Sequence, residues 1–409
     1  MSTDRLPPPN STKRGSLVIA GSGIASLGQM TLDTISHLEK AERVFYLVVD
    51  PVTEAYIQEK NGNNVNLSVY YDTTKQRYRS YVEMAEVMLR AVRAGQRVLG
   101  LFYGHPGFFA TPSHRALTLA RAEGYEARML PGISSFDCMI ADLEFEPGLY
   151  GCTIHEATDL LARDRQLDPQ AHNIILQPIA AGVTTLQDEP ENSKFQLLVA
   201  LLIQIFGQDH KVTLYTGAVS PLSSSAMVVY TLENLRNEQI AREISSRSSL
   251  YIPPRDIRPL SSSRSDELQL HEHALPLLGT PPVWEGSKFV NSAPYGPLES
   301  LFVSELDQHV TPISHKPLRA SPAMKKFMID LALDEAKQKD LLQNPFAVAC
   351  SIEDLTDFER TVLIKYCNTP KAITYAMREP GDLTEAKLVA DLAVYGTDTN
   401  EPPAYSIAF

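Results

Sequence analysis

Apolar runs of strand length alternate, along the first part of the chain, with segments whose apolar residues recur roughly every three to four positions. The run Ser16–Ala20 is followed by the glycine turn Gly21–Gly23 and a helical stretch from Met30 to Ala41. The run Val98–Tyr103 is equally apolar and breaks at once into the turn Gly104–Gly107. A buried strand that ends in a glycine turn is typical of a parallel α/β sheet, whose loops meet at its carboxyl edge. We therefore expect a ligand site at that edge.

The same pattern predicts the remaining elements of an α/β domain. We expect strands at Val44–Val49, Leu67–Tyr71, Ala127–Leu130, Asn173–Leu176, Val212–Tyr215 and Ser249–Ile252, and helices at Tyr81–Val92, His114–Glu123 and Phe195–Phe206. The domain covers residues 15–254 and has two lobes, with the boundary between them near residues 140–150.

The rest of the chain divides by composition. Residues 1–14 are polar and contain three consecutive prolines, which predicts a disordered tail. Residues 255–320 are rich in Pro, Ser and His and have weak periodicity, which is typical of an extended arm. Residues 321–378 carry apolar side chains at helical spacing and predict a small all-α module. Residues 379–409 form a linker and a C-terminal segment.

Composition and charge narrow the possible partners. The chain of 409 residues is 44% hydrophobic and 21% charged, as in a globular protein, and its net charge of -12 without a Lys/Arg cluster argues against nucleic acid. The apolar run Leu197–Phe206 is too short to span a bilayer, so we expect no membrane partner. The four cysteines lack C-x-x-C spacing, which favours reduced thiols and a cytoplasmic location.

Several residues suggest ligand chemistry without specifying it. Gly21 and Gly23 follow a strand and would let backbone approach a nucleotide, but Gly28 does not complete the G-x-G-x-x-G pattern. Asp50, at the end of the second strand, is the type of residue that holds a ribose, so a nicotinamide cofactor and a generic turn both remain possible. His271–His273 lies in a polar arm without further ligands, and we expect no metal site.

Motifs along nearly the whole chain carry a family resemblance. The loop Tyr103–Gly107, together with Gly21–Gly23 and Pro131–Ser135 at the ends of neighbouring strands, resembles the tetrapyrrole methylases, which are two-lobed α/β proteins that bind S-adenosylmethionine between the lobes. The chain is more similar still to the fungal borosin (omphalotin-type) α-N-methyltransferases, in which the enzyme is fused to its own peptide substrate. The matching segments are GSGIASLGQMTL, VFYLVVDPVTEAYI, VYYDTTKQRYRSY, FYGHPG, SHRALTLARAEGY, ARMLPGIS, YIPP and SIEDLTDFER.

The resemblance implies an autocatalytic reaction. Its members methylate backbone amides near their own C-terminus with S-adenosylmethionine, as precursors of ribosomally made N-methylated peptide natural products. Two chains interlock as a homodimer, the arm and helical module over residues 255–377 clasp the partner, and each tail enters the partner's active site. Family substrate segments are long and rich in Val, Ile and Gly, and this tail departs from that pattern. Because proline lacks an N–H group, the candidate methylated residues after Pro403 are Tyr405, Ser406, Ile407, Ala408 and Phe409.

The chemistry of amide methylation indicates which side chains are needed. An amide nitrogen is neither basic nor nucleophilic, so its proton must be removed while charge on the carbonyl oxygen is stabilised. An Arg beside a Tyr lowers the phenol's pKa and can pair with the oxyanion. Tyr71, Arg77 and Tyr81 match the family's catalytic residues, and we expect Tyr71 or Tyr81 to be the base and Arg77 its electrostatic partner. Aromatic packing with a cation–π contact is the alternative.

The resemblance also assigns the cofactor contacts. Besides Gly21 and Gly23, they fall on Tyr103, His105, Phe108, Ser134, Ser135, Gln177, Gly217, Ala218 and Ser248. Two other functions remain open. A methylase of a free small molecule, such as a tetrapyrrole, would leave residues 255–409 without a purpose, and a non-catalytic assembly protein would use the arm and helical module for dimerisation.

Overall fold

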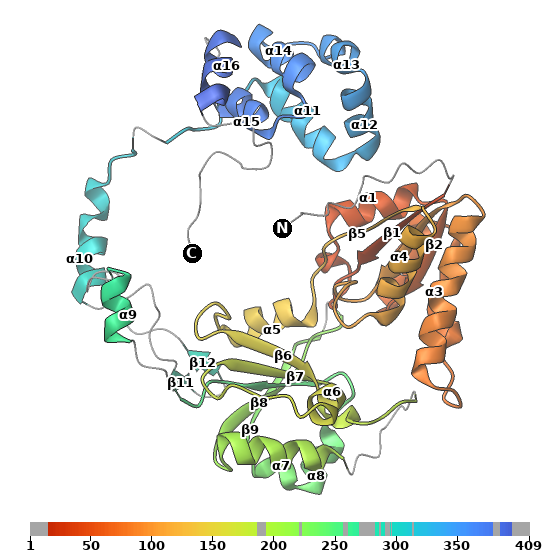
Figure 1. The fold of residues 1–409 in the computed structure, drawn as a ribbon, viewed down its shortest axis with the longest axis vertical. Helices are drawn as coiled ribbons and strands as arrows, with labels where there is room; N and C mark the ends of the chain where they lie inside the picture. Colours follow the sequence, from red (N-terminus) through yellow and green to blue (C-terminus); the bar gives the residue numbers. More distant parts are fainter. Residues whose placement is uncertain are drawn as a thin grey trace. The chain divides into compact units, whose positions relative to one another are not determined.

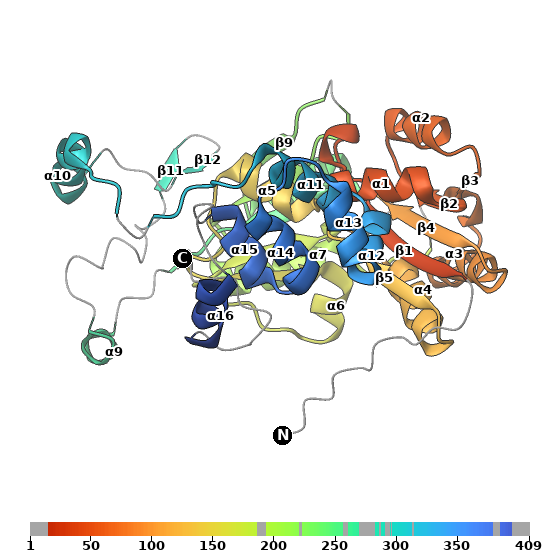
Figure 2. The same ribbon diagram turned by 90° about the horizontal axis from the view of Figure 1, so that it is seen from above.

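The computed structural model describes residues 15–185, 194–220, 223–256, 261–269, 283–285, 288–290, 295, 297–312, 315–378 and 385–394. It divides into two compact units, Met1–Pro294 and Tyr295–Phe409 (Figures 1 and 2). The expected disordered tail at residues 1–14, His271–His273 and the candidate methylated residues Tyr405–Phe409 lie outside the described residues.

The first lobe of the first unit is a parallel sheet with the strand order β3-β2-β4-β1-β5. Its elements are β1 (Ser16–Gly21), α1 (Leu32–Lys40), β2 (Arg43–Leu47), α2 (Pro51–Lys60), β3 (Asn64–Asn66), α3 (Arg77–Arg93), β4 (Arg97–Phe102), α4 (Thr111–Ala122), β5 (Glu126–Met129) and α5 (Ser135–Leu143). Leu17 and Ile19 of β1 pack with α3 and α4, whereas Ala20 packs on the opposite face with α1 and α2. Because both faces of the sheet are covered, β1 and β4 are apolar almost throughout.

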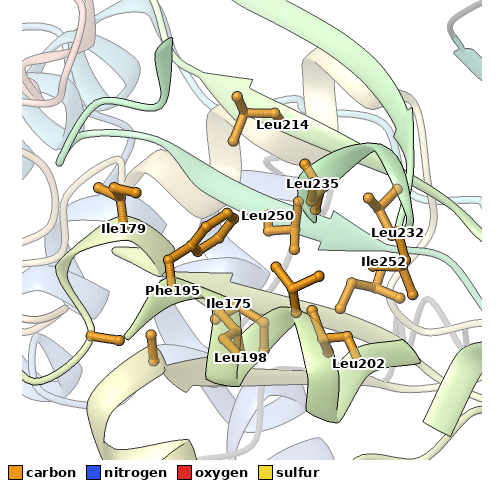
Figure 3. Packing of buried hydrophobic residues seen from close by; sticks show 14 of the residues in the cluster. Ile175, Ile179, Phe195, Leu198, Leu202, Leu214, Leu232, Leu235, Leu250 and Ile252 are labelled. Atoms are coloured by element: carbon orange, nitrogen blue, oxygen red, sulfur yellow. The ribbon is translucent and has the colours of Figure 1, made fainter. Parts of the chain in front are cut away.

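The second lobe is a mixed sheet with the strand order β6-β7-β10-β8-β9, in which only β6 and β7 are parallel neighbours. Its elements are β6 (Cys152–Glu156), α6 (Ala157–Ala162), β7 (His172–Leu176), α7 (Phe195–Phe206), β8 (Lys211–Thr216), β9 (Ala226–Thr231), α8 (Glu238–Glu243) and β10 (Ser249–Ile252). Figure 3 shows Phe195, Leu198 and Leu202 of α7 packed with Ile175 of β7 and Leu250 of β10. This apolar layer holds the second sheet in place.

The segment after the second strand differs from the sequence prediction. The strand expected at Leu67–Tyr71 is a 3-10 turn over Leu67–Tyr70, and β3 lies just before it. The Asn66 side chain accepts a hydrogen bond from the backbone of Ser68 at 2.8 Å, which favours a turn over a strand at this point. The helix α2 and the strands β6 and β9 were not predicted.

Asp50 has a structural role instead of the ribose contact that we considered. Its carboxylate caps α2 by accepting hydrogen bonds from the backbone of Val52 at 3.3 Å and of Thr53 at 3.0 Å, and from the Thr53 hydroxyl at 2.8 Å. The interpretation as a nicotinamide site is therefore wrong, because the oxygens of this buried carboxylate satisfy a helix terminus.

Short elements follow the second lobe, and a helical group completes the second unit. They are α9 (Ser262–Glu267), the hairpin β11 (Val283–Glu285) and β12 (Lys288–Val290), α10 (Pro297–Glu305), α11 (Pro322–Leu333), α12 (Glu335–Gln343), α13 (Pro345–Ser351), α14 (Asp357–Tyr366), α15 (Pro370–Arg378) and α16 (Glu385–Val394). The buried Glu359 accepts hydrogen bonds from the Ser321 backbone at 2.7 Å, the Ser321 hydroxyl at 2.8 Å and the Thr356 backbone at 2.9 Å. One carboxylate therefore joins the starts of α11 and α14, at the helix start that the sequence predicted.

His172 contacts the segment that connects the two lobes, between α5 and β6. Its backbone N–H donates to the carbonyl of Gly151 at 3.0 Å, and its Nδ1 lies 2.9 Å from the Tyr251 hydroxyl. Its ring centroid is 5.0 Å from that of Phe145 and 6.2 Å from that of Tyr150, both in the connecting segment. Burial lowers the pKa of His172 to about 4. The imidazole is therefore neutral at physiological pH.

This buried histidine predicts a loss of stability in mild acid. The unfolded chain takes up a proton near the ordinary pKa of 6.5, whereas the folded chain does not until about pH 4. The free energy of unfolding should therefore fall by about 2 kcal/mol between pH 7.5 and 5 because of this residue. Urea unfolding of the wild type and of His172→Gln at both pH values measures the difference. Equal pH dependence in the two proteins would contradict this role for His172.

Candidate functional site

A pocket of about 300 Å³ is lined by residues from both lobes of the first unit. Of the residues predicted from the sequence, Tyr71, Arg77, Tyr81, Tyr103, His105, Phe108, Ser134, Ser135, Gln177, Gly217 and Ser248 line it. Gly21, Gly23 and Ala218 are not among its lining residues. The pocket therefore lies at the carboxyl edge of the first sheet, as the strand and turn pattern predicted.

Gly21 and Gly23 lie behind the pocket and bring two backbone turns together. The N–H of Gly104 donates to the carbonyl of Gly23 at 2.8 Å, and both glycines have a φ of 72°, a value that favours residues without a Cβ. A Cβ on Gly21 would lie 2.2 Å from the carbonyl oxygen of Gly104 and 2.9 Å from Cδ of Pro106. The loop after β4 can therefore reach its place only because glycine stands at the end of β1.

Gln29 supports the same turn, and sequence reasoning missed it. Its Oε1 accepts hydrogen bonds from the backbone of Ile24 at 2.7 Å and Ala25 at 3.0 Å, while its Nε2 lies 3.2 Å from Cys138 Sγ on α5. Ile24 lines the pocket, and its Cδ1 lies 2.6 Å from where a Cβ on Gly217 would stand. Gln29 therefore positions a side chain that bridges from the first lobe to the second. No local sequence pattern marked this residue.

Tyr71, Arg77 and Tyr81 come together on one wall of the pocket. The rings of Tyr71 and Tyr81 are 6.4 Å apart between centroids and meet edge to face at 77°. Arg77 begins α3, its backbone N–H donates to the carbonyl of Thr184 at 2.9 Å, and its guanidinium donates to the carbonyl of Val183 in the second lobe. These two bonds fix the arginine beside the two phenols.

The pKa of Tyr71 differs from our expectation. Burial raises it above the ordinary value, and the neighbouring Tyr81 and Tyr103 raise it further, whereas Arg77 lowers it. The arginine therefore acts in the predicted direction, but burial outweighs it. In the protein without substrate, Tyr71 is a protonated phenol that can donate a hydrogen bond.

Two pocket residues have an uncommon backbone conformation. Gln177 has φ and ψ of 51° and 47°, and Phe109 has a φ of 59°, although neither is glycine. Both residues line the pocket. Left-handed backbone at bulky residues costs free energy and is concentrated at ligand sites, where the surrounding structure holds it.

The lining fits the donor that the family resemblance implies. Tyr103, Phe108 and Leu176 supply apolar and aromatic surface, and an aromatic face attracts a cation such as a sulfonium. Ser134 is the N-cap of α5, and its hydroxyl accepts from the backbone of Phe136 at 3.1 Å, so α5 begins at the pocket wall. Hydroxyl and backbone groups of this kind can hold the polar parts of S-adenosylmethionine.

Neither a metal centre nor a membrane-spanning helix is present in the part of the chain that the structure describes. No group of His, Cys, Asp or Glu side chains in this part of the chain is arranged to hold a metal ion. No described helix combines the length and the apolar character needed to cross a membrane.

Comparisons with known proteins give the relationships of the chain. Residues 16–235 match the tetrapyrrole (corrin/porphyrin) methylases, and residues 294–406 match the borosin biosynthesis clasp domain. A methyltransferase/ribosomally synthesized type I borosin cyclic peptide precursor of Serendipita vermifera subsp. bescii is 50% identical over 86% of this chain and 86% of that protein. A protein of the same description from Gymnopilus junonius is 44% identical over 92% of this chain and 90% of its own length. The methyltransferase/ribosomally synthesized cyclic peptide omphalotin A precursor of Omphalotus olearius is 39% identical over 91% and 92%, respectively.

The contact between the two turns predicts different effects of substitution at Gly21, the last residue of β1, and at Gly28, in the short 3-10 turn that follows. Gly21→Ala should lower the free energy of unfolding by about 1–3 kcal/mol, because the new methyl group would meet backbone atoms that cannot move independently. Gly28→Ala is the matched control: its Cβ would meet no atom within 4 Å, so we expect a change within about 0.5 kcal/mol. Calorimetric melting of both variants tests the contact, and equal stabilities would show that the turns do not depend on it.

Proposed function

Because the chain belongs to the borosin precursor methyltransferases of the tetrapyrrole methylase fold, we propose that it methylates backbone amide nitrogens of its own C-terminal segment with S-adenosylmethionine. The protein is a methyltransferase and the precursor of a ribosomally made peptide. The candidate acceptors are the amides of Tyr405–Phe409.

One observation carries this proposal. The similarity to precursors that contain their own peptide continues past the methylase domain and through the clasp domain at residues 294–406. A methylase of a free small molecule leaves this region without a role, and a non-catalytic assembly protein leaves the two phenols and the arginine on the pocket wall without one.

The arrangement of Tyr71, Arg77 and Tyr81 suits amide methylation. When bound, S-adenosylmethionine supplies an electrophilic methyl group on a sulfonium. The carbonyl oxygen of the acceptor amide gains negative charge as the N–H proton leaves, and the Arg77 guanidinium and the protonated Tyr71 hydroxyl can both donate hydrogen bonds to it. We assign the acceptance of the amide proton to Tyr81 on the same wall, in its phenolate form. The phenolate oxygen takes the N–H proton as the nitrogen gains the methyl group, and the resulting phenol gives the proton to water before the next turnover.

A homodimer is the second part of the proposal. In α10, the successive residues Leu301, Phe302 and Val303 are 50%, 56% and 49% exposed. Successive helix residues point to different sides, and a helix that is apolar on several sides is stable when another surface covers it. In the proposed dimer, the second unit of each chain would clasp the other chain, and the second copy would cover α10. The tail of each chain would enter the pocket of its partner. The free cysteines Cys138, Cys152, Cys350 and Cys367 are compatible with a cytoplasmic location.

Substitutions of the pocket wall test the chemistry. Tyr81→Phe should lower the rate of tail methylation by about 10²–10⁴-fold, because it removes the proton acceptor. Arg77→Ala should lower it by about 10²–10³-fold, because it removes a charge from the developing oxyanion. Mass spectrometry of the tail over time gives the rates, and Tyr78→Phe is the control, because this exposed residue of α3 does not line the pocket. Full activity of both pocket variants would refute the assignment.

A change of charge on α10 tests the dimer. Phe302→Asp should shift the protein from dimer to monomer in light scattering after size exclusion, because burying the new carboxylate is unfavourable. Ser304→Asp adds the same charge to the same helix without removing apolar surface, and this variant should remain dimeric. If Phe302→Asp is also fully dimeric, α10 does not lie in the interface.

A further inference from the structure

Arg247 lines the pocket but has no part in the function described so far. It lies in the turn before β10, where its backbone N–H donates to the Ser245 hydroxyl at 3.3 Å and the N–H of Ser248 donates to the carbonyl of Ser245 at 3.0 Å. The Ser248 hydroxyl lies 2.8 Å from the Thr216 hydroxyl at the end of β8. The turn is therefore connected to the second sheet by hydrogen bonds, and Arg247 lines the pocket from this turn.

The charge of Arg247 is not balanced within the pocket. No Asp or Glu is among the described residues that line the pocket, and no described side chain forms an ion pair with this guanidinium. Arg77, the other arginine of the pocket, already donates to the carbonyl of Val183. A guanidinium presents five N–H donors in a planar fork that matches a carboxylate. Arg247 is thus an open binding group for an anion.

Arg247 acts electrostatically on Tyr103, which lines the same pocket. The protein atoms around the phenol raise the pKa of Tyr103, although the residue is 49% exposed to solvent. Tyr81 raises this pKa further, and the positive charge of Arg247 opposes the rise. The pKa of Tyr71 has similar causes: after burial, Tyr81 and Tyr103 raise it, and the positive charge of Arg77 lowers it. Arg77 therefore acts on Tyr71 and Arg247 acts on Tyr103, and all four residues line the same pocket. A ligand group held by Arg247 would lie in the same pocket as Tyr71, Arg77 and Tyr81.

We propose that Arg247 binds a carboxylate that enters this pocket and thereby sets the position of a reactant. This inference rests on the proposed function. The carboxylate has two possible sources: the methionine part of the methyl donor, or an acidic side chain of the chain's own tail, where Asp398 and Glu401 precede the candidate acceptors. Two hydrogen bonds between guanidinium and carboxylate would hold either one in a defined orientation.

Binding of two probes tests the donor as the source. S-adenosylhomocysteine contains the amino acid carboxylate, and 5′-methylthioadenosine lacks it. If the donor supplies the carboxylate, Arg247→Gln should weaken the binding of S-adenosylhomocysteine by about 10–100-fold and leave the binding of methylthioadenosine unchanged. Isothermal titration of the full chain measures both affinities. Arg242→Gln is the control, because Arg242 lies on α8, pairs with Glu238 and does not line the pocket.

Methylation of the tail tests the other source. If the tail supplies the carboxylate, Arg247→Gln should leave the affinity for S-adenosylhomocysteine unchanged and slow tail methylation by about 10–100-fold. The double variant Asp398→Asn, Glu401→Gln should show the same loss in the wild-type background and no further loss in the Arg247→Gln background. Arg247→Lys, which keeps the charge without the fork, should recover part of the loss in either case.

Two results would overturn the proposal. In one, Arg247→Gln matches Arg242→Gln in both affinities and in the methylation rate. In the other, it weakens the two probes equally and lowers the melting temperature, which would indicate a structural role. If the wild-type tail is not methylated at all, the proposed function fails, but the comparison of the two probes still tests whether Arg247 binds the carboxylate of the donor.

Discussion

The close approach of two backbone turns at the carboxyl edge of the first sheet determines the geometry of the pocket. Gly21, at the end of β1, leaves room for the carbonyl of Gly104, and the hydrogen bond from Gly104 to Gly23 closes the contact. The loop after β4, which carries Tyr103 and His105, is therefore packed against the end of β1 and hydrogen-bonded to the turn that follows it. Gln29 connects the same turn to α5, because its side chain accepts a hydrogen bond from the Ile24 backbone and contacts Cys138. The first-lobe wall of the pocket therefore depends on a small number of contacts at these turns.

Burial and charge act against each other at Tyr71, which lines the pocket together with Arg77 and Tyr81. Arg77 favours ionisation of Tyr71, but removal of the phenol from water opposes it more strongly, so Tyr71 remains protonated. A protonated phenol and a guanidinium are both hydrogen-bond donors, and amide methylation requires donors at the carbonyl oxygen. The same burial that prevents Tyr71 from acting as a base in the free protein therefore suits it to stabilise the oxyanion.

Sequence reasoning succeeded where the apolar pattern of an element is continuous or strongly periodic. The strands β1, β4 and β10 and the helix α7 have continuous or strongly periodic apolar patterns, and their predicted bounds agree with the structure to within one or two residues. It failed for α2, where only Thr53 and Ile57 are buried and the apolar stripe is too short to recognise. Arg247 also escaped notice. It enters the pocket because β10 pairs with β8, with Ser249 opposite Tyr215, and the residues around it carry no sign of that pairing.

The central claim is that the chain's own backbone amides are the methyl acceptors. Tandem mass spectrometry of the full-length protein, incubated with S-adenosylmethionine carrying an isotopically labelled methyl group, tests it most directly. Our account predicts labelled methyl groups on backbone nitrogens between Ala404 and Phe409, located by the fragment ions on either side of each amide. An unlabelled tail, or label confined to side chains or to an added small molecule, would contradict it.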